Sequence, residues 1–308
     1  MRFCVLPILA LIAFGQDAPT FKTAISLVHV DAEVVAQDGR ILIGFSREDF
    51  RVLDEGKEQP ILHFSSGEDP LDLILLFDVS GSMKPKVAEV AAAAREGVQE
   101  LRPGDRVAVM AFNSRSREVL PFTDNLERVQ QSIREDILGL RFGGGTLIQS
   151  AVSDAAKRFL REPRTERRRA VLIVTDDFGQ RTRREATVIQ ELWEADALLT
   201  GLIVRSPQVY AAQTLGSIMN PAMIALRAGV RGIAEKTGGD FLRAADSGRG
   251  FQESMRRIRS RYSLYYAMPA GKPGTRRTIR VELTAAEKHS KARVRARTGY
   301  FTPAEAPR

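Results

Sequence analysis

Asp78-Val79-Ser80-Gly81-Ser82-Met83 follows directly on the apolar run Leu71-Asp72-Leu73-Ile74-Leu75-Leu76-Phe77. The run is short, aliphatic and barely alternating, which is typical of a strand buried on both faces of a parallel sheet. It ends in one carboxylate and two hydroxyls around a glycine turn. Hard oxygen donors of this kind suit Mg²⁺, Mn²⁺ or Ca²⁺ rather than zinc or copper.

Two further polar loops occur downstream. Gly143-Gly144-Gly145-Thr146 precedes a predicted helix, and Thr175-Asp176-Asp177 ends the apolar run Ala170-Val171-Leu172-Ile173-Val174. In open α/β sheets, ligands bind at the carboxyl ends of the strands. We therefore expect these loops to converge with the first motif on one site.

Strand and helix patterns alternate between residues 70 and 261. Strands are predicted over 71–77, 107–112, 119–122, 170–174, 197–204 and 240–242, and helices over 84–101, 125–140, 147–160, 183–196, 223–236 and 251–261. This alternation predicts an α/β fold with a doubly wound, mostly parallel, Rossmann-like sheet that has helices on both faces.

The flanking segments have a different character. Residues 16–66 and 262–303 read as short β segments with turns, and each is too small to hold a core alone. We predict that they pack together as one small β-sandwich, with the domain of residues 70–261 inserted between them. Residues 304–308 read as a loose tail.

The order Asp78-x-Ser80-x-Ser82, Thr146, Asp176 resembles the metal-ion-dependent adhesion site of von Willebrand factor type A domains, and the resemblance covers roughly residues 70–260. It implies a bound Mg²⁺, or Mn²⁺ or Ca²⁺ in its place. It further implies that Ser80, Ser82 and Thr146 are direct ligands, while the two aspartates act mostly through water. A Glu or Asp carboxylate of a protein partner would then complete the coordination.

Asp177 departs from this pattern, because the family usually has glycine after the second aspartate. We regard Asp177 as an additional candidate metal ligand. The whole chain also resembles bacterial exported proteins related to this domain. Their short β segment corresponds to Glu48–Val52 with Gly56-Lys57, and their basic β tail ends in Gly299-Tyr300-Phe301.

The net charge of +8 is concentrated near the end of the chain. Arg249 to Arg308 contains fifteen Lys or Arg against four Asp or Glu, so the predicted metal domain is close to neutral. This argues against a specific nucleic-acid groove at the cation site. The arginine clusters at 164–169, 181–184 and 256–261 are predicted to be solvated faces; the alternative is attraction to acidic envelope surfaces or to nucleic acid.

The sequence also predicts export. Cys4 is the single cysteine, so no internal disulfide can form. Residues 1–15 resemble a secretory signal peptide, with Arg2 before the apolar run 5–14 and a small-residue cleavage site before Gln16. No other stretch is apolar enough to cross a bilayer. We expect a secreted or periplasmic protein.

Enzyme motifs are not apparent. The glycine loop lacks the Gly-Lys-Ser/Thr of a phosphate-binding loop, and Ile148 takes the place of the third glycine of a dinucleotide fingerprint. His29, His63 and His289 lie outside the predicted metal domain. The prediction is therefore a non-enzymatic binding or adhesion module. The alternatives are a metal-dependent hydrolase that uses the same cation, and a basic module that binds polyanions.

Overall fold

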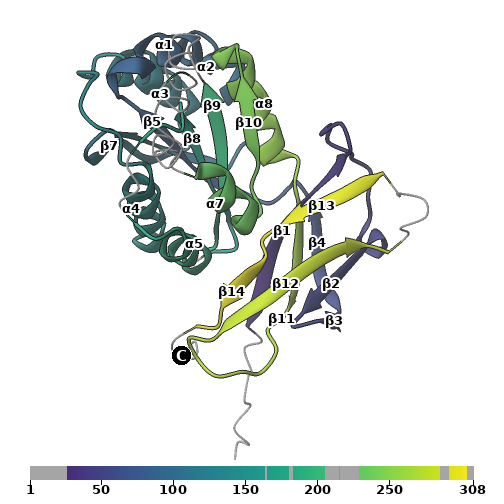
Figure 1. Ribbon diagram of the computed structural model, residues 1–308. Coiled ribbons are helices and arrows are strands. Elements are labelled where there is room, and N and C mark those ends of the chain that lie inside the picture. Colours follow the sequence, from purple (N-terminus) through teal and green to yellow (C-terminus); the bar gives the residue numbers. More distant parts are fainter. Residues whose placement is uncertain are drawn as a thin grey trace, which may run out of the picture.

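The computed structural model describes residues 26–163, 165–179, 183–204, 215, 229–284 and 291–303. Figure 1 shows two parts, an α/β domain and a smaller β domain beside it. The predicted signal segment 1–15, the lead-in 16–25, the tail 304–308 and most of residues 205–228 lie outside the described residues.

The α/β domain is built on a six-stranded sheet with the order β10-β9-β8-β5-β6-β7. Its strands are β5 (Leu71–Asp78), β6 (Arg106–Phe112), β7 (Ser116–Thr123), β8 (Arg168–Thr175), β9 (Ala197–Val204) and β10 (Phe241–Ala244). All neighbouring pairs are parallel except β6 and β7. The prediction of a doubly wound, mostly parallel sheet is confirmed, and the predicted strand 119–122 lies in its antiparallel edge strand.

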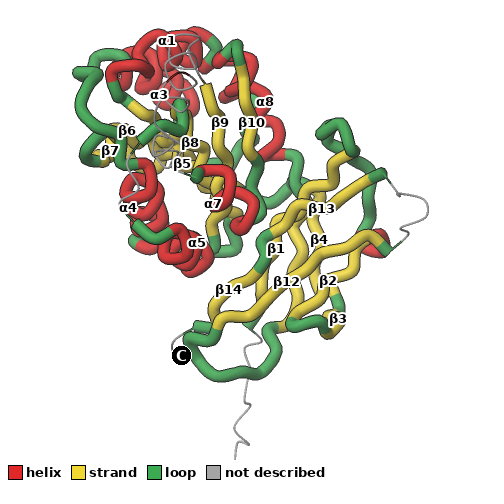
Figure 2. The backbone as a smooth tube through the Cα atoms, in the orientation of Figure 1, coloured by secondary structure: helices red, strands yellow, loops and turns green. Residues whose placement is uncertain are grey.

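Helices cover both faces of this sheet (Figure 2). One face carries α1 (Lys84–Ala92), α2 (Ala94–Val98), α3 (Leu126–Gln131), the π-helical turn η3 (Ser132–Ile137) and α8 (Ser247–Arg259). The other carries α4 (Ile148–Leu160), α5 (Glu185–Glu194) and α7 (Val230–Thr237). Every residue of β5 is buried. Because both faces of β5 are covered by helices, its sequence does not alternate between apolar and polar residues.

The predicted helix over 84–101 is interrupted. α1 and α2 meet at Ala93, which has φ −93° and ψ 4°. α8 packs closely here, since a side chain at Gly97 would collide with the ring of Phe251 and Gly248 adjoins Ala93. Among the described residues, no helix has the length and apolarity that a membrane span requires.

The smaller domain is a β-sandwich of two four-stranded sheets, ordered β13-β1-β11-β4 and β14-β12-β2-β3. The N-terminal segment supplies β1 (Leu27–Ala36), the 3-10 turn η1 (Arg47–Asp49), β2 (Phe50–Asp54), β3 (Lys57–Gln59) and β4 (Ile61–Ser66). The C-terminal segment supplies β11 (Tyr262–Ala267), β12 (Arg276–Leu283), β13 (Ala292–Ala296) and β14 (Gly299–Phe301).

Antiparallel pairing joins the two segments of the sandwich. β1 lies between β11 and β13, and β2 pairs with β12. The inner faces of the two sheets share one apolar core that includes Val30, Val52, Leu264 and Val281. The predicted packing of the two terminal segments is confirmed.

The outer face of β1 is polar and lies against the α/β domain. Asp31 and Glu33 point away from the sandwich core, yet they are only 8% and 0% exposed. Arg168, the first residue of β8, is wholly buried and donates from Nε to Asp31 Oδ1 over 2.6 Å. It also donates to the carbonyl oxygen of Ile258 over 2.9 Å. This contact fixes the two domains together.

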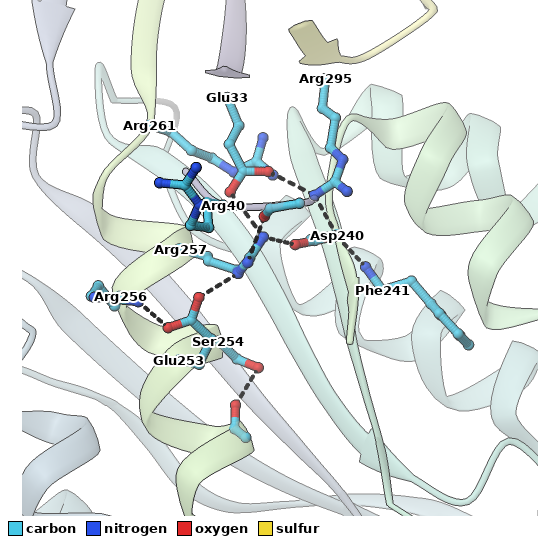
Figure 3. A network of polar contacts seen from close by, with 12 residues as sticks. Glu33, Arg40, Asp240, Phe241, Glu253, Ser254, Arg256, Arg257, Arg261 and Arg295 are labelled. Carbon is cyan, nitrogen blue, oxygen red and sulfur yellow. Dashed lines mark hydrogen bonds and ion pairs between the residues drawn. The ribbon is translucent and has the colours of Figure 1, made fainter. Parts of the chain in front are cut away.

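A second group of charges lies beside the first (Figure 3). Arg295 of β13 donates to Glu33 over 3.1 Å and pairs with Asp240 at 2.7 Å. Arg257 of α8 pairs with the same Asp240 at 2.7 Å, and Arg261 lies 3.7 Å from Glu33. The prediction that the arginine clusters 164–169 and 256–261 are solvated is therefore wrong for these interface residues.

We predict that Asp31→Asn destabilises the protein by about 3–5 kcal/mol, because the buried guanidinium of Arg168 then has no neutralising charge. Urea denaturation of the full chain measures this free energy of unfolding. Asp38→Asn is the matched control, since the side chains of Asp38 and Arg40 are 54% and 76% exposed. That pair is expected to contribute at most about 1 kcal/mol. Equal effects of the two variants would contradict a structural role for the buried pair.

His29 on β1 also joins the two domains. Its Nδ1 atom lies 3.2 Å from Asp196, which precedes β9, and its Nε2 atom lies 3.8 Å from Asp31. Arg168 and Arg297 each pair with one of these carboxylates. Burial alone would lower the pKa of His29, but the carboxylates of Asp31 and Asp196 outweigh it and raise the pKa above 6.5.

The free energy of unfolding should therefore depend on the protonation of His29. Because the pKa is raised in the folded state, the contribution is fully present below about pH 6.5 and is lost as the pH rises through the folded pKa. An increase of one in this pKa corresponds to about 1.4 kcal/mol. Urea denaturation between pH 5 and 9 should show this decrease in the wild type and in His63→Gln, where an exposed histidine is replaced. His29→Gln should reduce this decrease in the free energy of unfolding. If the pH dependence of His29→Gln equals that of the wild type, the assignment to His29 is refuted.

Candidate metal centre

The polar loops predicted from the sequence meet at the carboxyl ends of β5, β6 and β8. Phe77 is paired in register with Val174, and Asp78 with Phe112. The chain continues from β5 to β6 on one side, while β8 lies on the other. This change of direction is the position where doubly wound sheets bind ligands.

Asp78 is fully buried at the end of β5. Its Oδ1 atom accepts a hydrogen bond from the backbone N–H of Ser80 over 2.9 Å. Its Oδ2 atom accepts from the hydroxyl of Thr175 over 2.7 Å. Burial raises the pKa of Asp78 to about 6, and the nearby charge of Asp176 acts in the same direction.

Ser82 and Asp176 are in direct contact. The hydroxyl of Ser82 donates to Asp176 Oδ2 over 2.9 Å, and Asp176 Oδ1 accepts from the backbone N–H of Phe178 over 3.0 Å. The first motif, which follows β5, is thereby joined to the loop after β8. The sequence separation of this hydrogen bond is 94 residues.

Ser80 has an unusual environment. The residue is 6% exposed, and its hydroxyl oxygen is buried without a hydrogen-bond partner. Its backbone carbonyl accepts from Met83 N–H over 3.1 Å, which closes the 3-10 turn η2 (Gly81–Met83). Burying a hydroxyl without a partner costs free energy, so this oxygen is suited to a ligand that supplies the missing interaction.

Thr146 is brought to the site by its backbone. The N–H of Gly143 donates to the carbonyl oxygen of Val79 over 2.9 Å, so the glycine loop lies against the first motif. At the other end of the loop, a side chain at Gly179 would collide with the carbonyl oxygen of Thr146. Thr146 is thus held between the first motif and the loop after β8, and it is half-buried.

Asp177 adopts a left-handed backbone with φ 58°. Glycine takes this conformation without strain, which gives a physical reason for glycine at this position in the related family. The N–H of Asp177 donates to the hydroxyl of Thr175 over 3.2 Å, and its Oδ1 atom accepts from the N–H of Val230 over 3.4 Å. One carboxylate oxygen thus contacts the first residue of α7. Its role as a metal ligand stays a prediction.

The residues present fit a hard divalent cation. Asp78, Ser80 and Ser82 after β5 lie beside Asp176 after β8, the backbone of the Thr146 loop adjoins both, and the hydroxyl of Ser80 is buried without a partner. The groups that donate hydrogen bonds to Asp78 are uncharged: the hydroxyl of Thr175 and the backbone amide of Ser80. A cation held by Ser80, Ser82 and Thr146 would supply the positive charge that these carboxylates favour.

Sequence reasoning assigned no role to two contributors, although it placed Thr175 in one of the polar loops. Thr175 bridges Asp78 and the N–H of Asp177, and Asn113 follows β6 and contacts the glycine loop. The available signal was positional, since each is a polar residue directly at the end of an apolar strand.

Residues 73–180 match the von Willebrand factor type A domain family. The chain contains a von Willebrand factor type A domain. The match ends directly after the loop that carries Asp176 and Asp177, so it includes every predicted metal-site residue. No curated protein matches the chain.

Several solved structures are similar to the protein. BatB from Bacteroides thetaiotaomicron is 18% identical over 61% of this chain and 97% of its own, with a TM-score of 0.47. An aerotolerance-related membrane protein from Bacteroides fragilis is 16% identical over 61% of this chain and 98% of its own, with a TM-score of 0.44. A von Willebrand factor type A protein from Catenulispora acidiphila is 12% identical and covers 92% of this chain and 76% of its own, with a TM-score of 0.45.

The hydrogen bond between Thr175 and Asp78 should stabilise the von Willebrand factor type A domain without metal. We predict that Thr175→Val lowers the free energy of unfolding in EDTA by about 1.5–3 kcal/mol, because a buried charged acceptor loses its donor. Thr200→Val in β9 is the matched control, since the hydroxyl of Thr200 is buried without a partner. That change should be neutral or stabilising. Equal losses in both variants would count against the prediction.

Proposed function

We propose that the protein is an exported, non-enzymatic binding module that captures an acidic group of a protein partner through a divalent cation. The von Willebrand factor type A domain suggests a role in protein interaction or adhesion. The observation that best supports the finer proposal is the buried, unpartnered hydroxyl of Ser80 beside the joined pair Ser82 and Asp176.

The side chains of the site would have different roles in holding the cation. Ser80, Ser82 and Thr146 would hold Mg²⁺, or Mn²⁺ or Ca²⁺, through neutral oxygens, while Asp78 and Asp176 would act mostly through water. When bound, the cation supplies positive charge and a coordination position for a Glu or Asp carboxylate of the partner. Few direct anionic ligands would leave that charge available to the partner.

The alternative of a metal-dependent hydrolase has less support. Among the described residues, no three His, Cys, Asp or Glu side chains gather closely enough to hold a metal ion by themselves. The site instead combines hydroxyls with two aspartates, and no histidine is among its predicted residues. This composition favours binding over hydrolysis, which requires a general base.

Export and contact with acidic envelope surfaces also belong to this proposal. Export rests on the sequence of residues 1–15. The basic surplus after Arg249 is partly used within the fold, since Arg257, Arg261 and Arg295 face Glu33 and Asp240. Arg276 and Arg280 on β12 are exposed, but Arg280 pairs with Glu282 at 2.9 Å and Arg276 lies over the ring of Trp193, so only part of their charge would be open to acidic surfaces.

Ser80→Ala tests the cation site most directly. Removing a hydroxyl that has no partner should leave the free energy of unfolding in EDTA nearly unchanged. It should lower the affinity for Mg²⁺ and Mn²⁺, measured by isothermal titration calorimetry on the full chain, by about tenfold or more, because a direct ligand is lost. Ser153→Ala in α4 is the matched control, since that hydroxyl is also buried without a partner but lies outside the site.

The same protein and its two variants test whether partner binding depends on the cation. Retention of envelope proteins should require Mg²⁺, fail in EDTA and fail with Ser80→Ala, while Ser153→Ala behaves as the wild type. No detectable binding of Mg²⁺, Mn²⁺ or Ca²⁺ by the wild type would refute the proposed function. Retention that persists in EDTA and weakens steeply with salt would instead indicate polyanion-type binding.

A further inference from the structure

The loop after β6 lies against the glycine loop that carries Thr146. Phe112 ends β6, and its carbonyl oxygen accepts from the N–H of Val79 in the first motif over 2.8 Å. The next residues, Asn113 and Ser114, therefore begin beside the site. They contact the glycine loop along most of its length.

Asn113 holds both ends of the glycine loop. Its side-chain Nδ2 donates to the carbonyl oxygen of Gly143 over 2.9 Å, and its backbone carbonyl accepts from the N–H of Leu147 over 3.0 Å. Its Oδ1 atom accepts from the N–H of Arg115 over 3.2 Å, which fixes the side chain itself. Thr146 lies between the two points that Asn113 contacts.

Ser114 contacts the middle of the same loop. Its hydroxyl accepts from the N–H of Gly145 over 3.0 Å. A Cβ atom at Gly145 would lie 3.3 Å from this hydroxyl, and one at Gly144 would lie 3.4 Å from it. The contact at Gly145 is tight, so glycine there allows the close approach of Ser114, whereas the contact at Gly144 is an ordinary one.

The glycine loop needs such support from outside. Gly143 and Gly144 have φ values of 150° and 84°, which few other residues adopt, and glycine loses more conformational freedom on folding than any other residue. A run of three glycines has no side chains with which to hold its own shape. If the loop were ordered only on metal binding, that entropy cost would reduce the affinity.

We propose that Asn113 is a positioning residue of the cation site, which holds the Thr146 loop in place before the cation binds. The inference rests on the proposed function, because Thr146 has to be a ligand for its position to matter. Asn113 acts through the backbone at Gly143 and Leu147. Ser114 assists at Gly145.

The test compares Mn²⁺ affinities of full-length variants by isothermal titration calorimetry. Asn113→Ala should lower the Mn²⁺ affinity about five- to tenfold, because the glycine loop would then lose its conformational entropy on binding the cation. Asn125→Ala is the matched control: Asn125 accepts from Arg128 N–H at the start of α3, so its loss lowers stability without touching the site. It should bind Mn²⁺ as the wild type does.

A double-mutant cycle distinguishes positioning from general destabilisation. In a Thr146→Ala background, Asn113→Ala should have little further effect on the affinity, because the ligand that it positions is gone. If Asn113→Ala alone does not fold, Ser114→Ala carries the test, with an expected two- to threefold loss of affinity.

The outcomes separate the two hypotheses. Wild-type protein that binds no Mn²⁺ would refute the proposed function and this inference with it. Wild-type binding together with unchanged affinity in Asn113→Ala and Ser114→Ala would overturn the positioning role alone. So would an equal loss of affinity in Asn125→Ala.

Discussion

The structure depends on the burial of two acidic side chains on the outer face of β1. Alternation along this strand places Val30 and Ala32 in the sandwich core, so Asp31 and Glu33 point toward the α/β domain. Buried carboxylates are tolerated only when they are paired and hydrogen-bonded. Arg168 of the α/β domain pairs with Asp31, while Glu33 pairs with Arg295 of the neighbouring strand β13 and lies 3.9 Å from Arg257 and 3.7 Å from Arg261. The acidic face of β1 is therefore neutralised partly by its own sheet and partly by the α/β domain. The chain crosses between the two domains twice, from β4 into β5 and from α8 into β11.

This interface determines which end of the parallel sheet faces solvent. Arg168 begins β8, and Asp196 precedes β9, so the sandwich contacts the amino ends of these strands. The predicted cation ligands follow the carboxyl ends. The eight residues of β8 span about 26 Å at the usual rise of a strand. The sandwich is thus fixed at the end of the sheet opposite the candidate site, where it does not obstruct a partner.

Patterns of local sequence were sufficient to predict the doubly wound sheet and the pairing of the terminal segments, because buried parallel strands and amphipathic helices have distinct periodicities. They failed for Arg168 and Arg261, which lie in charge-rich segments and were expected in solvent. The partner of Arg168 is 137 residues away in sequence, so no local rule could identify it. The same limit applies to Asn113, whose contact with Gly143 spans 30 residues. The resemblance to von Willebrand factor type A domains identified candidate metal ligands but not the residues that position them.

The two groups of buried carboxylates differ in how their charge is balanced. At the domain interface, Asp240 faces arginine side chains; burial opposes ionisation there, but Arg295 and Arg257 outweigh it and lower its pKa. At the candidate site, the hydrogen-bond donors to Asp78 are a hydroxyl and an amide, and burial raises its pKa. The protein therefore neutralises its structural carboxylates with its own side chains and leaves Asp78 without that compensation. The proposed divalent cation would restore the charge balance of such a group and could still be shared with a partner.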